Sequence, residues 1–568
     1  MSRLAFIPNA YQGRSTAFES QRYINLYPEL TAAANEKGVG MLVGVPGKRL
    51  FSSGLASPVR GSLSFNGLIY AVESNQLVSI DATGAVTTLG ALNTSTGRVA
   101  MSQNGILSAG IGGNQVIIVD GVNGYIYNIL TAAFAQITDP DFPANPQQVE
   151  YSDGYFIVTN GTMNASACDL YNGLSWNALA TSPVESASDN IVGLINLKEQ
   201  LFFIKQFTSE VFYNNSTSTA VGFPYSRMQG AVIDYGAVSP WTIARGDGSI
   251  FFLAYERDGD GNPCFVGVVE LNGYTPTPIC PQAIVYKMSQ STDLTQCFGF
   301  FYSTEGHKFY QVTNPVDDWT FVYDTTSQMW HERSTANLAD DNVHRDLANC
   351  YVNAFGMNLV GDIYTGNLYE VNSKFYTDAG MPIVSEQIAQ HIIDSQSLDD
   401  IFVDELQIAI ESGVGRTDVN APAVAQAVLA GDGVSSIVIT YNGADYTTVP
   451  TVMLQSTDGN GSGATATATV TNGSVTGMTV TAAGSGYTAA PLVIFAMPEV
   501  TPTAGLSRSK DGGRTWGPES TRSMGNIGQY RKRVLWRSVG RCKDLVFRLR
   551  ISSPVKRIIT GWYAEASK

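Results

Sequence analysis

The chain has 568 residues and a formal net charge of −15, with 49 Asp and Glu against 34 Lys and Arg. Only 15% of its residues are charged and 56 are glycine, which is typical of a β-rich protein with many tight turns. The length predicts more than one domain, and the acidic balance disfavours a general nucleic-acid coat. No apolar run approaches the roughly 18 residues of a membrane helix, and the N-terminus lacks the apolar core of a signal peptide. Six cysteines without a Cys-x-x-Cys pair predict free thiols from a reducing compartment.

Residues 1–50 show little periodicity and are expected to form an extended segment that leads into the next domain. From about residue 58 the sequence changes to short strands separated by turn residues. The stretch 63–72 reads as two strands joined at Asn66-Gly67, which is a strong hairpin signal. Such hairpins recur in groups roughly 40 to 55 residues apart, a period that is typical of propeller repeats.

This period, with about four strands per group, predicts an all-β fold and a β-propeller of about six to eight blades. One blade cannot bury both of its faces, whereas blades packed around an axis bury one another. A long array of sandwiches is the alternative, but no Greek-key spacing supports it. We assign residues 51–415 to the propeller and an adjoining β segment.

Residues 416–504 are poor in charge and rich in Thr, Ala, Val and Gly. They contain an internal repeat of 41 residues, in which 437–450 corresponds to 478–491. Alternation at 464–470 and the Asn472-Gly473 turn predict strands and a hairpin. We therefore expect a small all-β domain with two similar halves, inserted into the main body, which resumes at 505–568.

The segment 505–568 holds 15 Lys and Arg against 4 Asp and Glu, while the rest of the chain holds 19 against 45. One interpretation is a pair of amphipathic strands whose basic side chains cover apolar neighbours and keep their charges in water. The other is a basic surface that faces an anionic partner, either acidic protein or nucleic acid.

The same segment contains an Asp-box pattern, made of Ser509, Asp511, Gly513, Thr515 and Trp516. The Ser and Asp side chains are expected to close a β-hairpin by bonding its backbone, and the Trp to pack on the sheet. Asp boxes are common in sialidases, but a sialidase site needs an arginine cluster and acidic groups for glycosyl transfer. Arginines are few and isolated before residue 500. We predict that the protein is not an enzyme, and the alternative is a carbohydrate-binding or sialidase-like propeller protein.

No pattern predicts a metal, a cofactor or catalytic residues. Asp258-Gly-Asp260-Gly-Asn262 resembles the start of a calcium loop, but Pro263 and Val269 stand where Gly and Glu are needed, so a polar hairpin loop is expected. The four histidines have no metal-binding spacing. They are His307, His331, His344 and His391.

A set of short motifs along the chain resembles one family in order. The C-terminal motifs are 530–541, 547–550 and 553–555; the earlier ones are 46–47, 58–61, 272–276, 305–310, 323–333, 361–370 and 411–415. Together they closely resemble the packaged-DNA stabilisation proteins, also called tail hub or nozzle proteins, of short-tailed (podovirus-type) phages. The resemblance covers nearly all of 20–415 and 505–568, and 416–504 departs from it.

The resemblance implies a structural virion protein of the phage tail, made in the host bacterial cytoplasm. The family forms a ring, usually a hexamer, below the adaptor (connector) ring. Its hub retains packaged DNA until a plug or tail needle seals the tube, and later forms the conduit for DNA ejection. A tail fibre or spike protein is a further implied partner, and the DNA would pass without sequence-specific binding.

Two expectations follow for charge and for the inserted domain. We expect an acidic channel-facing surface, which lets the duplex slide, and a basic C-terminal segment in a subunit or adaptor interface. The candidate interface residues are Arg531, Lys532, Arg533, Arg537 and Arg541, with ordinary exposed strand positions as the alternative. The inserted domain is either an outward binding domain for fibres or host surface, or a spacer between neighbouring subunits.

Overall fold

The computed structural model describes residues 2–3, 12–35, 38–54, 57–108, 110–336, 342–393, 399–413, 423–443, 446, 448–456, 460–495, 502–526 and 528–567, without the side chains of 2–3 and 32–38. The chain divides into two compact units. One contains Ala10–Ser15 and Leu50–Val371, and the other contains Met1–Asn9, Thr16–Arg49 and Asn372–Lys568. The domain boundaries expected from the sequence remain predictions. No helix of the described residues is long and apolar enough to cross a membrane.

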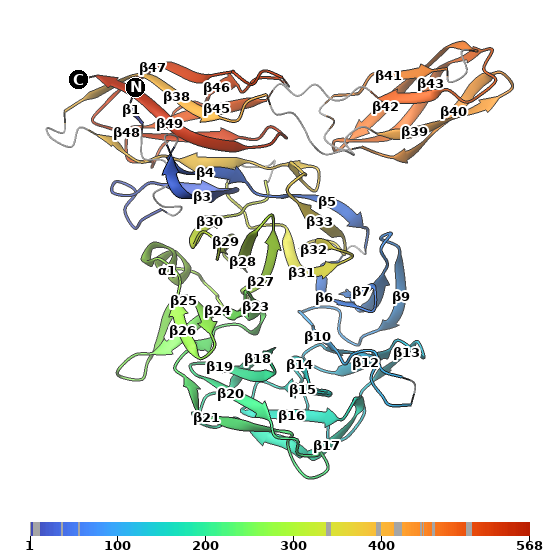
Figure 1. Ribbon diagram of the computed structural model, residues 1–568, viewed down its shortest axis with the longest axis vertical. Helices are drawn as coiled ribbons and strands as arrows, with labels where there is room; N and C mark the ends of the chain where they lie inside the picture. Colours follow the sequence, from blue (N-terminus) through green and yellow to red (C-terminus); the bar gives the residue numbers. More distant parts are fainter. Residues whose placement is uncertain are drawn as a thin grey trace. The chain divides into compact units, whose positions relative to one another are not determined.

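The described part of Leu50–Val371, with β5, which begins at Gly47, forms seven antiparallel groups of strands, here called blades 1 to 7 (Figure 1). Blades 1 to 3 consist of β6 (Val59–Phe65), β7 (Leu68–Glu73), β8 (Gln76–Ile80) and β9 (Val86–Ala91); β10 (Ala100–Gln103), β11 (Gln115–Val119), β12 (Gly124–Asn128) and β13 (Ala133–Gln136); and β14 (Gln148–Ser152), β15 (Tyr155–Thr159), β16 (Asn164–Asp169) and β17 (Asn172–Pro183). Blades 4 and 5 consist of β18 (Ile191–Leu197), β19 (Gln200–Lys205), β20 (Ser209–Asn214) and β21 (Tyr225–Ile233); and β22 (Gly236–Ala237), β23 (Ala244–Gly246), β24 (Ser249–Arg257), β25 (Pro263–Asn272) and β26 (Thr275–Pro278). Blades 6 and 7 consist of β27 (Phe298–Thr304), β28 (His307–Asn314), β29 (Trp319–Asp324) and β30 (Met329–Glu332); and β31 (Ala348–Ala354), β32 (Met357–Asp362), β33 (Leu368–Asn372) and β5 (Gly47–Ser52).

One strand of each blade, the first except in blade 5, contacts its counterparts in a closed ring. β6 contacts β10, β10 contacts β14, and the series continues through β18, β23, β27 and β31 back to β6. Blade 7 is completed by β5, which comes from before blade 1 and pairs with β33. Joining the two ends of the repeat in one sheet leaves no open edge inside the ring. The all-β propeller prediction is confirmed, and the seven described blades lie within the expected range.

Local turn chemistry explains why the blades begin as hairpins. At the end of β6, Asn66 and Gly67 both have positive φ, 49° and 71°, and Phe65 pairs with Leu68. Two successive positive φ angles define the two-residue turn that suits twisted strands, and Asn-Gly adopts it at low cost. The hairpin expected at 63–72 is therefore confirmed.

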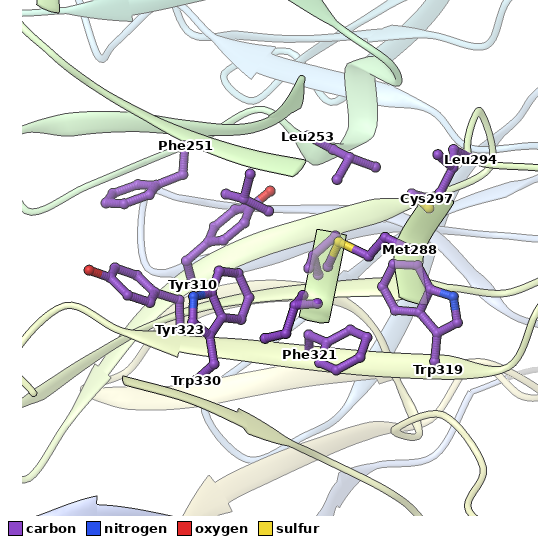
Figure 2. Packing of buried hydrophobic residues seen from close by; sticks show 13 residues of the cluster. Phe251, Leu253, Met288, Leu294, Cys297, Tyr310, Trp319, Phe321, Tyr323 and Trp330 are labelled. Atoms are coloured by element: carbon purple, nitrogen blue, oxygen red, sulfur yellow. The ribbon is translucent and has the colours of Figure 1, made fainter. Parts of the chain in front are cut away.

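Blades bury one another through apolar clusters. Between blades 5 and 6, Phe251 of β24 packs on Tyr310 of β28, with ring centroids 5.4 Å apart (Figure 2). Trp319, Phe321 and other buried residues continue this cluster, which also includes Met288 of the helix α1 (Gln282–Ser289). Burial of large aromatic side chains supplies most of the stabilisation of such a contact.

Two hydrogen-bonded arginines connect the inner strands. Arg98, just before β10, donates to the carbonyl and the side chain of Asn349 in β31, at 3.0 and 2.7 Å, and lies over Phe298 of β27. Blades 2 and 6 are not neighbours in the ring, so this side chain spans part of its interior. On the other side, Arg245 of β23 donates to Asn196 of β18 at 3.1 Å and lies 3.9 Å from Glu150 of β14.

Outside the repeat domain, the strands of the second unit form two layers. Their strand orders are β3-β4-β49-β38-β47 and β2-β36-β48-β45-β46, with β1 (Ser2–Arg3) on β49 and β37 (Ile392–Ile393) on β48. Their bounds are β2 (Arg22–Ile24), β3 (Leu26–Asn35), β4 (Gly38–Gly44), β36 (Ser385–Ile388), β38 (Ile401–Ile410), β45 (Thr503–Ser509), β46 (Ser520–Ser523), β47 (Val534–Cys542), β48 (Asp544–Ile551) and β49 (Ile558–Ser567). The short strands β34 (Thr377–Asp378) and β35 (Met381–Pro382) pair with each other, and β34 also pairs with β5. Buried Trp562 of β49 donates to Gln387 of β36 at 2.9 Å, which ties the two sheets together.

The repeat domain is described over 423–443, 446, 448–456 and 460–495. Each half contains a hairpin and one further strand: β39 (Val424–Ala430), β40 (Gly433–Tyr441) and β41 (Val452–Gln455), then β42 (Ser462–Thr471), β43 (Ser474–Ser485) and β44 (Leu492–Phe495). The backbone N–H of Tyr446 donates to Gly473, and that of Tyr487 donates to Asp432. Tyr487 lies 41 residues after Tyr446, and Asp432 lies 41 residues before Gly473, so the two bonds are equivalent in the repeat. Each half therefore hydrogen-bonds the hairpin turn of the other half. The hairpin expected at Asn472-Gly473 is confirmed.

Candidate interaction site

The candidate interface residues lie at one margin of the two-sheet unit. β47 is the edge strand of the first sheet and β46 is the edge strand of the second. Trp536 of β47 is buried and donates to the carbonyl of Ser520 in β46 at 2.8 Å, which closes the margin. We call the exposed cations of β45, β46, β47 and the turn between β46 and β47 the basic edge.

A bulge in β47 sets which of its side chains face outward. Ser538 has φ 53°, and the pairing with β38 shifts register between Gly540 and Arg537. Val534, Trp536 and Val539 are consequently buried, while Arg537 and Arg541 point to solvent with 76% and 70% of their side chains exposed. A bulge is a common way to re-aim side chains at a sheet edge.

Arg537 and Arg541 are paired within the chain. Arg537 lies 3.1 Å from Glu405 and Arg541 lies 3.2 Å from Asp400, so carboxylates of and next to β38 neutralise both. Exposed pairs of this kind contribute about 0–1 kcal/mol, because solvent screens them. Each can exchange its partner at little cost.

Arg531, Lys532 and Arg533 are different. They lie in the turn between β46 and β47, all three are exposed, and their side chains make no ion pair or hydrogen bond with a described residue. Tyr530 beside them is 71% exposed. The turn itself is held by its backbone, since Lys532 N donates to Gln529 O at 3.2 Å and Gly528 N donates to Gly413 O at 3.1 Å. The structure thus separates the five candidates into a pair with internal partners and a free basic tip.

Sequence reasoning missed two further members of the basic edge. Arg508 of β45 donates to the carbonyl of Val539, and Arg522 of β46 donates to the carbonyl of Leu535 at 3.2 Å. Both contacts depend on β45 and β46 packing beside β47, and no local pattern in the sequence reports that pairing.

The Asp box forms the connection that follows β45. Ser509 Oγ accepts from Gly513 N at 2.8 Å and donates to Asp511 Oδ1 at 2.6 Å, while Asp511 accepts from the backbone and hydroxyl of Thr515. These hydrogen bonds from Ser509 and Thr515 lower the pKa of Asp511 well below its ordinary value. A Cβ on Gly512, whose φ is 73°, would lie 3.0 Å from the backbone of Ala17. The arrangement is a rigid turn, and its acceptors are occupied by its own donors.

Trp516, the last Asp-box residue, packs under a cation. The guanidinium of Arg548 in β48 lies 4.8 Å from the centre of its ring, within the range of a cation–π contact.

The aspartate and histidine side chains that could bind a metal ion make other contacts. Asp258 Oδ1 accepts from the backbone of Asp260 and Asn262, as expected of a polar hairpin loop. Three of the histidines each lie beside one carboxylate: His307 with Asp324, His344 with Asp318 and His391 with Asp544. Over the residues that the structure describes, no group of three or more His, Cys, Asp or Glu could hold a metal ion.

Charge distinguishes the propeller from the C-terminal segment. Residues 50–371 hold 11 Lys and Arg against 29 Asp and Glu, a net charge of −18, whereas 505–568 carry +11. An exposed basic tip whose side chains make no ion pair with a described residue can recognise an anionic surface.

Two family models match the chain. The model described as the β-propeller of bacteriophage P22 Gp10 matches residues 6–376, and the model described as the β-sandwich of the same protein matches 478–567. The second match begins inside β43 of the repeat domain and includes the whole basic edge after it. A comparison with curated proteins finds no match.

Solved structures share only a general similarity. A streptogramin B lyase is 9% identical, with 57% of this chain and 96% of that chain covered and a TM-score of 0.35. The computationally designed Ika8 protein is 11% identical, with coverage of 57% and 99% and a TM-score of 0.33. YCF48 bound to a D1 peptide is 12% identical, with coverage of 58% and 98% and a TM-score of 0.33. The family assignment rests on the two family models.

Proposed function

Since the chain belongs to the bacteriophage P22 Gp10 family and is a phage structural protein, we propose that it is the tail hub, or nozzle, of a short-tailed phage. In this role it extends the DNA channel below the adaptor ring, retains the packaged genome and forms the conduit for ejection. It acts in the virion tail as a ring of identical subunits, for which a hexamer is the expected order. A plug or tail needle and a tail fibre or spike protein are its further proposed partners.

The observation that carries the interface part of this proposal is the free basic tip. Arg531, Lys532 and Arg533 hold three like charges in solvent without a partner, next to exposed Tyr530. Clustered exposed charge of one sign raises the association rate and fixes the register of a complementary acidic surface. We propose that the tip binds the adaptor ring or a neighbouring subunit, with Arg537 and Arg541 exchanging Glu405 and Asp400 for partner carboxylates.

The propeller has a different proposed role, at the channel wall. Its net charge of −18 would repel DNA phosphates and let the duplex slide without binding. We place the conduit between subunits and not along the axis of one propeller, because Arg98 reaches from blade 2 to blades 6 and 7 inside the ring.

The test is the mass of the purified protein in solution, alone and with the adaptor protein of the same phage. We expect a ring of about six copies, or a monomer that becomes a ring on the adaptor. A persistent monomer that ignores the adaptor would contradict the hub and direct attention to glycan binding by the propeller.

The basic tip is tested by reversing its charge in the variant Arg531→Glu, Lys532→Glu and Arg533→Glu. We expect it to fold normally and to lose assembly on the adaptor, with wild-type assembly weakened by salt. The control reverses three exposed cations elsewhere, Lys198, Arg257 and Lys374, for the same change in net charge. Equal assembly of the tip variant and the wild type would remove the tip from the interface and leave the hub role standing.

The role of the repeat domain is tested by deleting 416–504. Normal particles that no longer adsorb to the host would support a binding domain, and loss of assembled tails would support a spacer.

A further inference from the structure

Blade 4 buries three ionisable side chains beside one another. Lys205 ends β19, Glu210 lies in the neighbouring strand β20, and Asp189 lies in the loop before β18. All three side chains are 0% exposed. Charged groups are rarely buried completely unless their charges are compensated, because each costs several kcal/mol to remove from water.

The amine of Lys205 lies against both carboxylates. Its Nζ is 3.0 Å from Asp189 Oδ1 and 3.0 Å from Glu210 Oε1, and it donates to the carbonyl of Ala187 at 2.6 Å. Separations of this size suit proton exchange between the amine and either carboxylate.

The two carboxylates have different surroundings. Asp189 Oδ2 accepts from the backbone N–H of Phe207 at 2.8 Å and of Thr208 at 3.1 Å. Such a pair of N–H donors is how enzymes hold the oxygen of a tetrahedral intermediate. Glu210 Oε2, in contrast, has no hydrogen-bond partner, and the guanidinium of Arg227 lies 3.9 Å from it.

The charge balance of the cluster is incomplete. Two carboxylates and one ammonium are buried together, and half-exposed Arg227 is too distant for a hydrogen bond. Burial raises the pKa of Asp189, but hydrogen bonds from Phe207 and Lys205 bring it below its ordinary value. Condensing the amine and the carboxylate into a neutral amide would remove two buried charges.

We propose that Lys205 and Asp189 form an intramolecular isopeptide bond, with Glu210 as the catalytic proton carrier. A proton passes from Nζ through Glu210 to Asp189, which leaves a neutral amine and a neutral carboxylic acid. The nitrogen lone pair then attacks Asp189 Cγ, and the developing charge on Oδ2 is held by the N–H groups of Phe207 and Thr208. A second amine proton passes through Glu210 to the other oxygen, whose bond to Cγ breaks with its electron pair, and one water leaves.

The bond would close a covalent loop between the entry to blade 4 and its second strand. A loop closed in this way reduces the conformational entropy of the unfolded chain, as a disulfide does, but its formation needs no oxidant. This device suits a protein whose cysteines are free among the described residues.

The decisive experiment is mass spectrometry of the full-length wild-type protein under denaturing conditions. We expect an intact mass lower than the sequence mass by one water. After trypsin digestion we expect no cleavage at Lys205 and one branched peptide that joins residues 189 and 205. A full sequence mass, or a water loss mapped elsewhere with normal cleavage after Lys205, would overturn the proposal.

Two variants identify the chemistry. Glu210→Gln keeps the shape of the side chain but cannot carry the proton, and Lys205→Arg keeps a cation without a reactive amine. We expect both to have their full sequence masses. A branched peptide that persists in Glu210→Gln would remove Glu210 from the reaction, and the wild-type measurement decides the bond even if a variant fails to fold.

Discussion

The charged side chains of blade 4 are buried, whereas those of the basic edge are exposed to solvent. In blade 4, Lys205, Asp189 and Glu210 are completely buried, and the amine of Lys205 lies 3.0 Å from each carboxylate. At the basic edge, the side chain of Arg537 is 76% exposed and its ion pair with Glu405 is exposed to solvent. Arg531, in the turn before β47, makes no ion pair or hydrogen bond with a described residue. Buried charge therefore maintains the blade, and exposed charge is available for assembly.

The largest effect should come from removing the buried amine. Lys205→Met takes away the group that compensates both carboxylates, either as a cation or in the proposed bond to Asp189, and breaking such a cluster costs about 3–5 kcal/mol. Hydrogen exchange of the blade 4 strands, read by mass spectrometry, measures this local free energy of opening in a protein whose domains need not unfold together.

A matched lysine in the same blade provides the control. Lys198 is exposed at the turn before β19, and Lys198→Met should leave the exchange of blade 4 unchanged. Adding Glu210→Gln to Lys205→Met should recover part of the loss, because one buried charge then disappears. Equal exchange in Lys205→Met and the wild type would mean that the cluster does not maintain the blade.

A smaller effect separates two arginines that the sequence does not distinguish. Arg98 makes two charge-assisted hydrogen bonds to Asn349, and its burial lowers its pKa to about 10. Arg98→Met should destabilise the propeller by about 2–3 kcal/mol. One hydrogen bond to a charged group contributes about 1.5–3 kcal/mol, and two bonds to the same Asn349 do not add in full. Arg537→Met should cost about 0–1 kcal/mol.

The two arginine variants are compared by hydrogen exchange of β10 and β47. The order of their effects is the informative result. If Arg537→Met were the more damaging, the paired arginines of the basic edge would be structural, and their proposed exchange of partners during assembly would be wrong.

What the sequence could predict was local. The Asn66-Gly67 and Asn472-Gly473 hairpins follow from the positive φ angles that these residues adopt easily, and the propeller follows from the spacing of such hairpins. The 41-residue repeat could be seen in the sequence, but not that Tyr446 and Tyr487 each bond the turn of the other half.

What the sequence could not predict depends on pairing between distant segments. Closure of blade 7 by β5 joins residues about 320 positions apart, and no periodicity reports it. Arg537 is neutralised by Glu405, which lies 132 residues earlier, before the repeat domain. The five candidate interface residues form one basic run in the sequence. Only the position of β38 beside β47 distinguishes Arg537 and Arg541, which have a carboxylate partner, from the other three.

The last prediction concerns pH and a carboxylate that is neither free nor fully paired. Glu150 of β14 is mostly buried, and this burial raises its pKa from 4.5 to about 7, although Arg245 at 3.9 Å opposes the shift. The folded protein therefore holds this proton at pH values where the unfolded chain has lost it. Stability contributed by the protonated group is present below about pH 4.5 and is lost as the pH rises to about 7, by up to about 3 kcal/mol.

Glu150→Gln imitates the protonated group and should remove this pH dependence from the exchange of β14, once intrinsic exchange rates are corrected for pH. Arg245→Met removes the opposing cation, so it should raise the pKa further and steepen the loss between pH 5 and 8. The opposite sign, with β14 more stable at pH 7 than at pH 5 in the wild type and not in Glu150→Gln, would mean that Arg245 outweighs burial. Glu150 would then behave as the paired carboxylates of the basic edge do, and the contrast between buried and exposed charge would not extend to the propeller's inner strands.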